Sequence, residues 1–140
     1  MDINEYQKKV KVADEEYRWP DKIILVAEDI ELNYMYIREL LEPTGAMVVR
    51  VENGKKAVDY CINNPKVDMV LMDILMPVMN GYDATRLIKS FNKDIPVIAQ
   101  TAYALTEDRG KAMAAGCDDF IAKPIAKGEL LMKVNRLLTK

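Results

Sequence analysis

Four short apolar runs in this sequence end in side chains that could take part in phosphoryl chemistry. These side chains are a pair of adjacent carboxylates, a third carboxylate, a hydroxyl and an ammonium group: Glu28 and Asp29, Asp73, Thr101 and Lys123. Carboxylate oxygens bind hard cations such as Mg²⁺, and a carboxylate can also attack phosphorus as a nucleophile. A hydroxyl and an ammonium group can stabilise charge on a transferring phosphoryl group. Together these residue types predict a phosphoryl-accepting site, provided that the fold brings them together.

Each of these residues also has an ordinary structural interpretation when it is taken alone. Asp29 could cap the helix that follows it, and Glu28 and Lys123 could be solvated surface residues. Asp73 could simply occupy a turn, although a carboxylate that closes an apolar run is costly to bury without a partner. Thr101 fits the end of any strand. The functional interpretation therefore depends on the joint placement of the five residues.

The elements that must position these residues alternate between short apolar runs and amphipathic stretches. Near-continuous apolar strands predict a sheet covered on both faces, which is typical of a parallel α/β fold. We therefore expect one doubly wound parallel sheet of five strands, with each strand followed by a helix. The expected strands are 22–27, 47–51, 67–72, 95–100 and 119–122, and the expected helices are 31–41, 54–62, 83–91, 105–115 and 127–138.

In parallel α/β folds, ligands bind at the carboxyl ends of the strands, where all of the candidate residues lie. If the first and third strands are neighbours, about 5 Å apart, three carboxylates converge. Like charges at such a distance raise each other's pKa unless a cation lies among them. A site with few protein ligands, all of them oxygen, favours Mg²⁺ over Ca²⁺.

Composition excludes several other classes of protein. The 140 residues suit one domain, and a net charge of −2 with a pI near 5.3 argues against nucleic-acid binding. The chain has no histidine, so a phosphoryl group must come from a histidine outside this sequence or from a small phosphodonor. Cys61 and Cys117 have no metal-ligand spacing and are predicted to be reduced thiols in a cytoplasmic protein. No apolar run approaches the ~20 residues of a membrane span, so we expect no direct membrane contact.

Residues 1–20 do not follow the strand–helix pattern. Their apolar residues have the spacing of one helix face, and the segment ends at Trp19-Pro20. We predict an N-terminal linker or tail at 1–20 and a single domain at 21–140. The alternative is a short helix that packs on this domain or on a neighbouring one.

Four motifs resemble the response-regulator receiver domains of two-component signalling, in that family's order and spacing. The motifs lie at 24–29, 72–81, 100–102 and 119–125. The resemblance implies a flavodoxin-like sheet with strand order 2-1-3-4-5. It also implies that the domain promotes its own phosphorylation and slow dephosphorylation, rather than turning over a substrate. Two stretches, 76–86 and 116–125, are similar to receivers of hybrid sensor histidine kinases, which would make the leader an interdomain linker.

The resemblance also implies a role for each candidate residue. Asp73 is the expected phosphoacceptor and, with Asp29 and the backbone carbonyl of Leu75, a direct ligand of Mg²⁺ or Mn²⁺. Glu28 would hold the metal through water, and many family members have an aspartate at this position. The remaining expectations are a switch hydroxyl, a switch aromatic, a phosphate-pairing ammonium and a cis-proline: Thr101, Phe120, Lys123 and Pro124.

The implied partner is a histidine kinase or a histidine phosphotransfer protein that donates the phosphoryl group. Three other functions are compatible with the same fold class. A phosphatase with an aspartyl-phosphate intermediate needs a second acid two residues after the nucleophile, where this chain has Leu75. A nucleotide or flavin binder needs a phosphate loop after the first strand, where this chain has Glu28-Asp29. A scaffold without phosphoryl chemistry would not need the full acidic set and Lys123.

Overall fold

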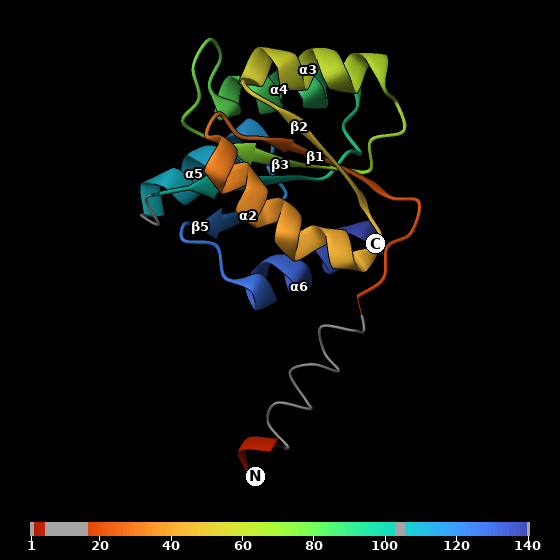
Figure 1. The fold of residues 1–140 in the computed structure, drawn as a ribbon. Helices are drawn as coiled ribbons and strands as arrows, with labels where there is room; N and C mark the ends of the chain where they lie inside the picture. The colour runs from red at the N-terminus through yellow and green to blue at the C-terminus, as the bar shows by residue number, and fades with distance from the viewer. Residues whose placement is uncertain (1, 5–16, 103–105, 140) are drawn as a thin grey trace.

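The computed structural model describes residues 2–4, 17–102 and 106–139, and it forms a five-stranded parallel sheet with helices on both faces (Figure 1). The strands are β1 (Ile23–Ala27), β2 (Met47–Val51), β3 (Met69–Asp73), β4 (Val97–Thr101) and β5 (Asp119–Ala122). The helices are α2 (Glu31–Leu41), the short 3₁₀ helix η1 (Glu42–Thr44), α3 (Gly54–Asn63), α4 (Gly81–Phe91), α5 (Thr106–Ala115) and α6 (Lys127–Leu138).

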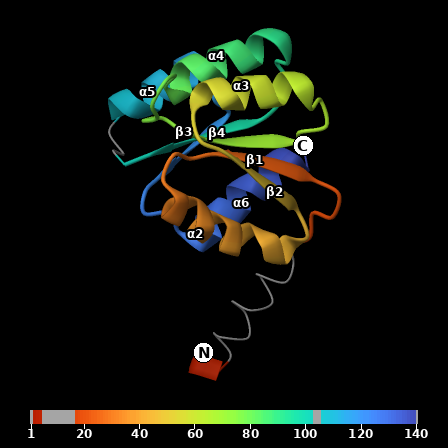
Figure 2. The same cartoon turned by 45° about the horizontal axis from the view of Figure 1, so that its top comes forward.

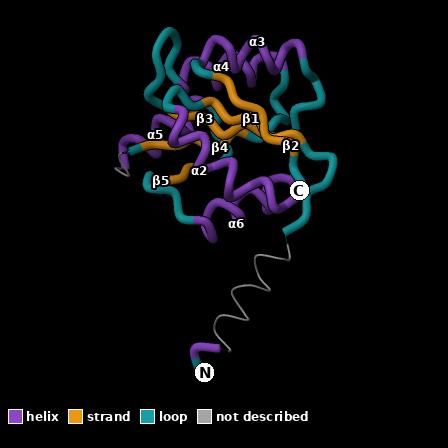
Figure 3. Tube along the Cα trace, viewed as in Figure 1, coloured by secondary structure: helices purple, strands orange, loops and turns teal. Residues whose placement is uncertain are grey.

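The strand order is β2-β1-β3-β4-β5, so the predicted doubly wound 2-1-3-4-5 topology is confirmed. Helices α3, α4 and α5 cover one face of the sheet, whereas α2 and α6 cover the other (Figure 2). The tube in Figure 3 shows the strands of the sheet lying between these two helical layers. Because strand order reverses between β1 and β3, the crevice for a ligand is expected at the carboxyl ends of these two strands.

The central strands are apolar because helices cover them on both sides. Every residue of β3 and β4 is buried, and successive side chains point to opposite faces of the sheet. Met72 of β3 packs with the core under α3–α5, while Leu71 packs with the core under α2 and α6. The next residue along β3 is Asp73, which is therefore held in a buried strand rather than in a flexible loop.

Several element boundaries differ from the sequence prediction by one or two residues, including the fourth strand at 97–101 rather than 95–100, and two of the differences have a local reason. The third strand begins at Met69 rather than 67, because the Asp68 carboxylate accepts a hydrogen bond from the Ile23 backbone N–H and ends the loop there. Helix α4 begins at Gly81 rather than 83, because Asn80 caps it by accepting a hydrogen bond from the backbone N–H of Asp83 at 3.0 Å. The predicted helix start at 105 lies outside the described residues.

Part of the leading segment packs against the domain. The Trp19 side chain is buried in the core between α2 and α6, and its indole N–H donates to Asn135 Oδ1 at 2.9 Å. Its backbone N–H donates to the Thr44 carbonyl at 2.7 Å, and the Tyr17 ring lies 5.8 Å from the indole ring. The division at residue 20 stays a prediction, and the predicted apolar helix face between residues 5 and 16 lies outside the described residues. None of the described helices is long and apolar enough to cross a membrane.

The close packing of Gly81 against the backbone of Asp73 and Ile74 allows a direct test of how tightly the loop after β3 is packed. A Cβ added at Gly81 would lie 2.3 Å from the Asp73 backbone oxygen and 2.9 Å from the Ile74 Cα, whereas one added at exposed Gly110 meets nothing within 4 Å. We expect Gly81→Ala to destabilise the protein by about 1–3 kcal/mol because backbone must shift. The matched variant Gly110→Ala should stabilise it by up to about 1 kcal/mol through helix propensity. Urea unfolding of both variants checks this, and an unchanged Gly81→Ala protein would contradict it.

Candidate metal and phosphoryl site

The five polar residues selected from the sequence lie at one edge of the sheet. Glu28 and Asp29 follow β1, Asp73 ends β3, Thr101 ends β4, and Lys123 follows β5. These strands are parallel and β1, β3, β4 and β5 are consecutive neighbours, so their carboxyl ends meet. The topology therefore brings together all five positions.

Three carboxylates converge at the ends of β1 and β3. One oxygen from each of Glu28, Asp29 and Asp73 lies within 4.8 Å of the other two. The Glu28 side chain is completely buried and Asp73 is 5% exposed, while Asp29 is more accessible. Two of the three negative charges are thus removed from water, where charge repulsion is weakly screened.

One ammonium group contacts both buried carboxylates. Lys123 Nζ lies 3.1 Å from Glu28 Oε1 and 3.2 Å from Asp73 Oδ2. Its backbone N–H donates to the Thr101 carbonyl at 2.7 Å, which ties the end of β5 to the end of β4. The peptide bond from Lys123 to Pro124 is cis. A single ammonium cannot neutralise three ionised carboxylates, so the cluster keeps an excess of negative charge.

The pKa values of the buried groups reflect this arrangement. Burial raises the pKa of Glu28, the neighbouring Asp73 carboxyl raises it further, and Lys123 offsets only part of the effect. Burial by itself lowers the pKa of Lys123, but the charges of Asp73 and Glu28 outweigh it and raise that pKa overall. Lys123 is therefore held as a cation, while a negative charge on Glu28 is unfavourable in the metal-free protein.

The backbone around the cluster is fixed by Arg50 of β2, which the sequence analysis did not select. The Arg50 guanidinium donates to the Glu28 carbonyl and to the Asp29 carbonyl, each at 3.0 Å. It also lies over the Tyr34 ring, 5.7 Å from the ring centroid. An arginine inside the apolar run 47–51 was the available signal, because a charged residue in a strand needs a specific partner.

On the other side of the cluster, the loop after β3 orients Asp73. The Leu75 backbone N–H donates to Asp73 Oδ1 at 3.2 Å, and the Gly81 backbone N–H donates to the Ile74 carbonyl at 3.0 Å. The Leu75 side chain is 63% exposed, so Leu75 approaches the acidic cluster through its backbone.

The two predicted switch residues occupy different environments. Thr101 is 4% exposed at the end of β4. Phe120 in β5 is half-buried and packs against the core beneath α3, α4 and α5. Phe120 is paired in register with Ala99, two residues before Thr101.

Gln100, immediately before Thr101, is a second residue that the sequence analysis did not select. Its side chain is completely buried, and neither amide atom has a hydrogen-bond partner among the described residues. An amide at the end of the apolar run 95–100 was the available signal. Such a group costs stability unless a ligand or water satisfies it.

The acidic cluster fits a hard divalent cation. Its donor atoms are carboxylate oxygens, the ligand type that Mg²⁺ prefers. Glu28 Oε2 is buried and has no hydrogen-bond partner among the described residues, so this oxygen is available to a metal or its bound water. The accessible Asp29 leaves room for the waters that Mg²⁺ usually keeps.

The fold and the acidic site are those of a receiver domain, and comparison with known proteins agrees. The model of the response regulator receiver domain family matches residues 24–135. The chain therefore belongs to this family of two-component signalling domains, whose members accept a phosphoryl group. The predicted family and fold class are confirmed.

Individual relatives include both short regulators and parts of larger sensors. The polar-differentiation response regulator DivK of Brucella anthropi is 36% identical over 75% of this chain and 86% of its own length. Sensor protein GacS of Pseudomonas syringae pv. syringae is 34% identical over 79% of this chain, which spans 13% of GacS. This chain also spans about half the length of the transcriptional regulators that it matches.

Among solved structures, the receiver domain of sensor histidine kinase PA1611 from Pseudomonas aeruginosa PAO1 is 36% identical. The two structures superpose with a TM-score of 0.79 over 85% of this chain and 98% of that domain. That structure has a magnesium ion coordinated in its active-site cleft.

The raised pKa of Glu28 predicts a pH-dependent cost to stability. Between the ordinary value of 4.5 and the raised value, the folded state binds more protons than the unfolded state, so the free energy of unfolding falls as pH rises through this window. Glu28→Gln removes this cost. In EDTA at pH 7 the variant should be more stable than wild type by about 1 kcal/mol, and the gain should shrink towards pH 4.5.

Denaturant unfolding at several pH values measures this difference. Glu39→Gln, which changes an exposed carboxylate on α2, is the matched control and should follow the wild-type pH dependence. If Glu28→Gln raises the free energy of unfolding by the same amount at pH 4.5 and at pH 7, the effect is not electrostatic.

Proposed function

We propose that Asp73 accepts a phosphoryl group from the phosphohistidine of a histidine kinase or a histidine phosphotransfer protein in the cytoplasm, with Mg²⁺ or Mn²⁺ as cofactor. The observation that carries this proposal is a buried Asp73 carboxylate that contacts the Lys123 ammonium at 3.2 Å beside two further carboxylates. The 140 residues contain no histidine, so the phosphohistidine donor lies outside this sequence. The similarity to the PA1611 receiver, part of a sensor histidine kinase, supports such a donor.

The residues that would hold the metal are those of the acidic cluster. Asp29 and Asp73 would be direct ligands with the backbone carbonyl of Leu75, and Glu28 would hold a metal-bound water. When bound, the metal neutralises the carboxylates and stabilises charge on the phosphoryl oxygens.

The protein's own groups account for the transfer step. A carboxylate oxygen of Asp73 forms a bond to phosphorus as the bond between phosphorus and the donor imidazole nitrogen breaks. The imidazole leaves with that electron pair and later takes a proton from solvent, so no oxidation occurs. Lys123 is held as a cation by its carboxylate neighbours, and we expect it to pair with a phosphoryl oxygen. The strand and Leu75 hold Asp73 in one orientation, which reduces the entropy cost of reaction.

The new phosphoryl group would then shift a conformational equilibrium. The Thr101 hydroxyl would move to bond a phosphoryl oxygen, and the Phe120 ring would turn inward. The surface formed by α5, β5 and α6 would change shape and alter partner binding. The phosphoryl group can bias this change only by its differential contacts with the two states, roughly a few kcal/mol. The division into a leading linker at 1–20 and a receiver at 21–140 suits a domain within a hybrid kinase.

Asp73→Asn tests the assignment of the phosphoacceptor. The variant keeps the shape of the side chain but loses the nucleophilic oxygen, so phosphorylation by a small phosphodonor with Mg²⁺ should be abolished. Intact mass spectrometry should show one added phosphoryl group on wild type with Mg²⁺, none with EDTA, and none on the variant.

Asp59→Asn, on the exposed face of α3, is the control for loss of a carboxylate and should be modified like wild type. Wild-type phosphorylation of Asp73→Asn would assign the acceptor elsewhere.

A further inference from the structure

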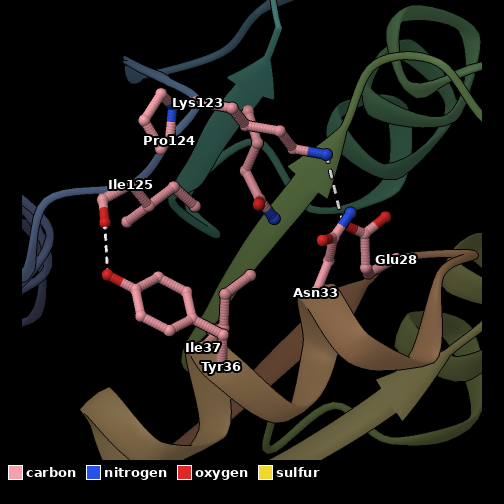
Figure 4. Close-up of a pocket in the computed structure, with 8 residues that line it drawn as sticks. Glu28, Asn33, Tyr36, Ile37, Lys123, Pro124 and Ile125 are labelled. Carbon is pink, nitrogen blue, oxygen red and sulfur yellow. Dashed lines mark hydrogen bonds and ion pairs between the residues drawn. The ribbon is translucent and has the colours of Figure 1, made fainter.

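A cavity of about 160 Å³ lies beside the acidic cluster, on the side of the sheet covered by α2 and α6. Asn33, Tyr36 and Ile37 of α2 form one wall, and Pro124 and Ile125 form the opposite wall (Figure 4). The Tyr36 hydroxyl donates to the Ile125 carbonyl at 2.7 Å and bridges the two walls. Glu28, which belongs to the acidic cluster, and Lys123 line one end, so the cavity shares these two residues with the proposed phosphoryl site and extends away from it.

Gln100 also lines this cavity, and its side-chain amide has no hydrogen-bond partner among the described residues. Ile98, two residues earlier in β4, packs in the core between α2 and α6, so the period of the strand directs Gln100 to the same face. The amide is fully buried, yet its oxygen and its nitrogen have no hydrogen-bond partner among the described residues. A buried amide that lacks both partners needs a group that offers one donor and one acceptor.

The volume of the cavity, its apolar walls and the charge at its polar end restrict the kind of ligand that it can bind. Its size is close to the roughly 150 Å³ of an apolar protein cavity that binds benzene. Ile37, Pro124 and Ile125 offer apolar surface to a flat ring. At the polar end, Glu28 lines the cavity beside Lys123, and the carboxylates of Asp29 and Asp73 lie next to Glu28 outside it, so an anionic ligand would be repelled.

We propose that this cavity binds a small planar carboxamide. The ring would lie between the apolar walls, and the carboxamide would exchange a pair of hydrogen bonds with Gln100, donating N–H to its oxygen and accepting N–H from its nitrogen. A cavity of this size with polar groups at one end can instead hold only water, which is the competing outcome of the test. The proposal goes beyond the phosphoryl chemistry and does not depend on it.

The test is a titration of the isotopically labelled 140-residue protein with benzamide, followed by NMR. The Gln100 side-chain amide signal and the methyl signals of Ile37 and Ile125 should shift together and saturate with a dissociation constant of about 1–10 mM, the range for a ligand of this size. Benzoate has the same shape but carries a negative charge and no donor, and it should bind at least about tenfold more weakly. Absence of a saturable shift with benzamide, or equal binding of benzoate, would overturn the proposal.

Gln100→Leu removes the amide while keeping a side chain of similar size. It should weaken benzamide at least about tenfold and leave toluene binding unchanged or tighter, because the apolar walls remain. Wild-type affinity of this variant for benzamide would also overturn the proposal. The comparison of benzamide with benzoate uses wild type alone, so it decides the matter even if the variant does not fold. Phosphorylation is measured separately, and its failure would leave this inference unaffected.

Discussion

The interaction on which this structure depends is the repulsion among three carboxylates, two of which share one ammonium group. Glu28 and Asp73 are buried, and Lys123 contacts both of them at about 3 Å. In the metal-free protein this cluster costs stability, as the raised pKa of Glu28 indicates. Unfavourable charge repulsion of this kind is typical of functional sites, where a bound cation or a transferring phosphoryl group relieves it.

The sheet and the loops at its carboxyl end hold the three carboxylates together despite this cost in stability. Every residue of the central strands β3 and β4 is buried, and Asp73 and Thr101 stand at their carboxyl ends. Arg50 fixes the backbone that carries Glu28 and Asp29, and the close approach of Gly81 to Asp73 fixes the loop on the other side. Rigid strands and short backbone contacts therefore hold the carboxylates together against their repulsion.

The sequence predicted the parts of the site that depend on strand ends, because an apolar run that stops at a charged residue marks both the strand and its functional end. Residues such as Asp73 and Lys123 could be selected for this reason. Arg50 and Gln100 were not selected, although each is a polar residue in an apolar run, because their importance depends on elements that are distant in sequence. Trp19 was grouped with the leading segment because Pro20 follows it, and its burial depends on Asn135, more than a hundred residues away.

The most direct measurement of the central claim is the dependence of stability on Mg²⁺ concentration. If the carboxylates are held together for a cation, unfolding free energy should rise with Mg²⁺ by about 2.7 kcal/mol at one hundred times the dissociation constant. Asp29→Ala should begin more stable than wild type in EDTA and gain little from Mg²⁺, whereas Asp59→Ala, on the exposed face of α3, should respond like wild type. No stabilisation of the wild type by Mg²⁺, or an equal gain in Asp29→Ala, would contradict the account.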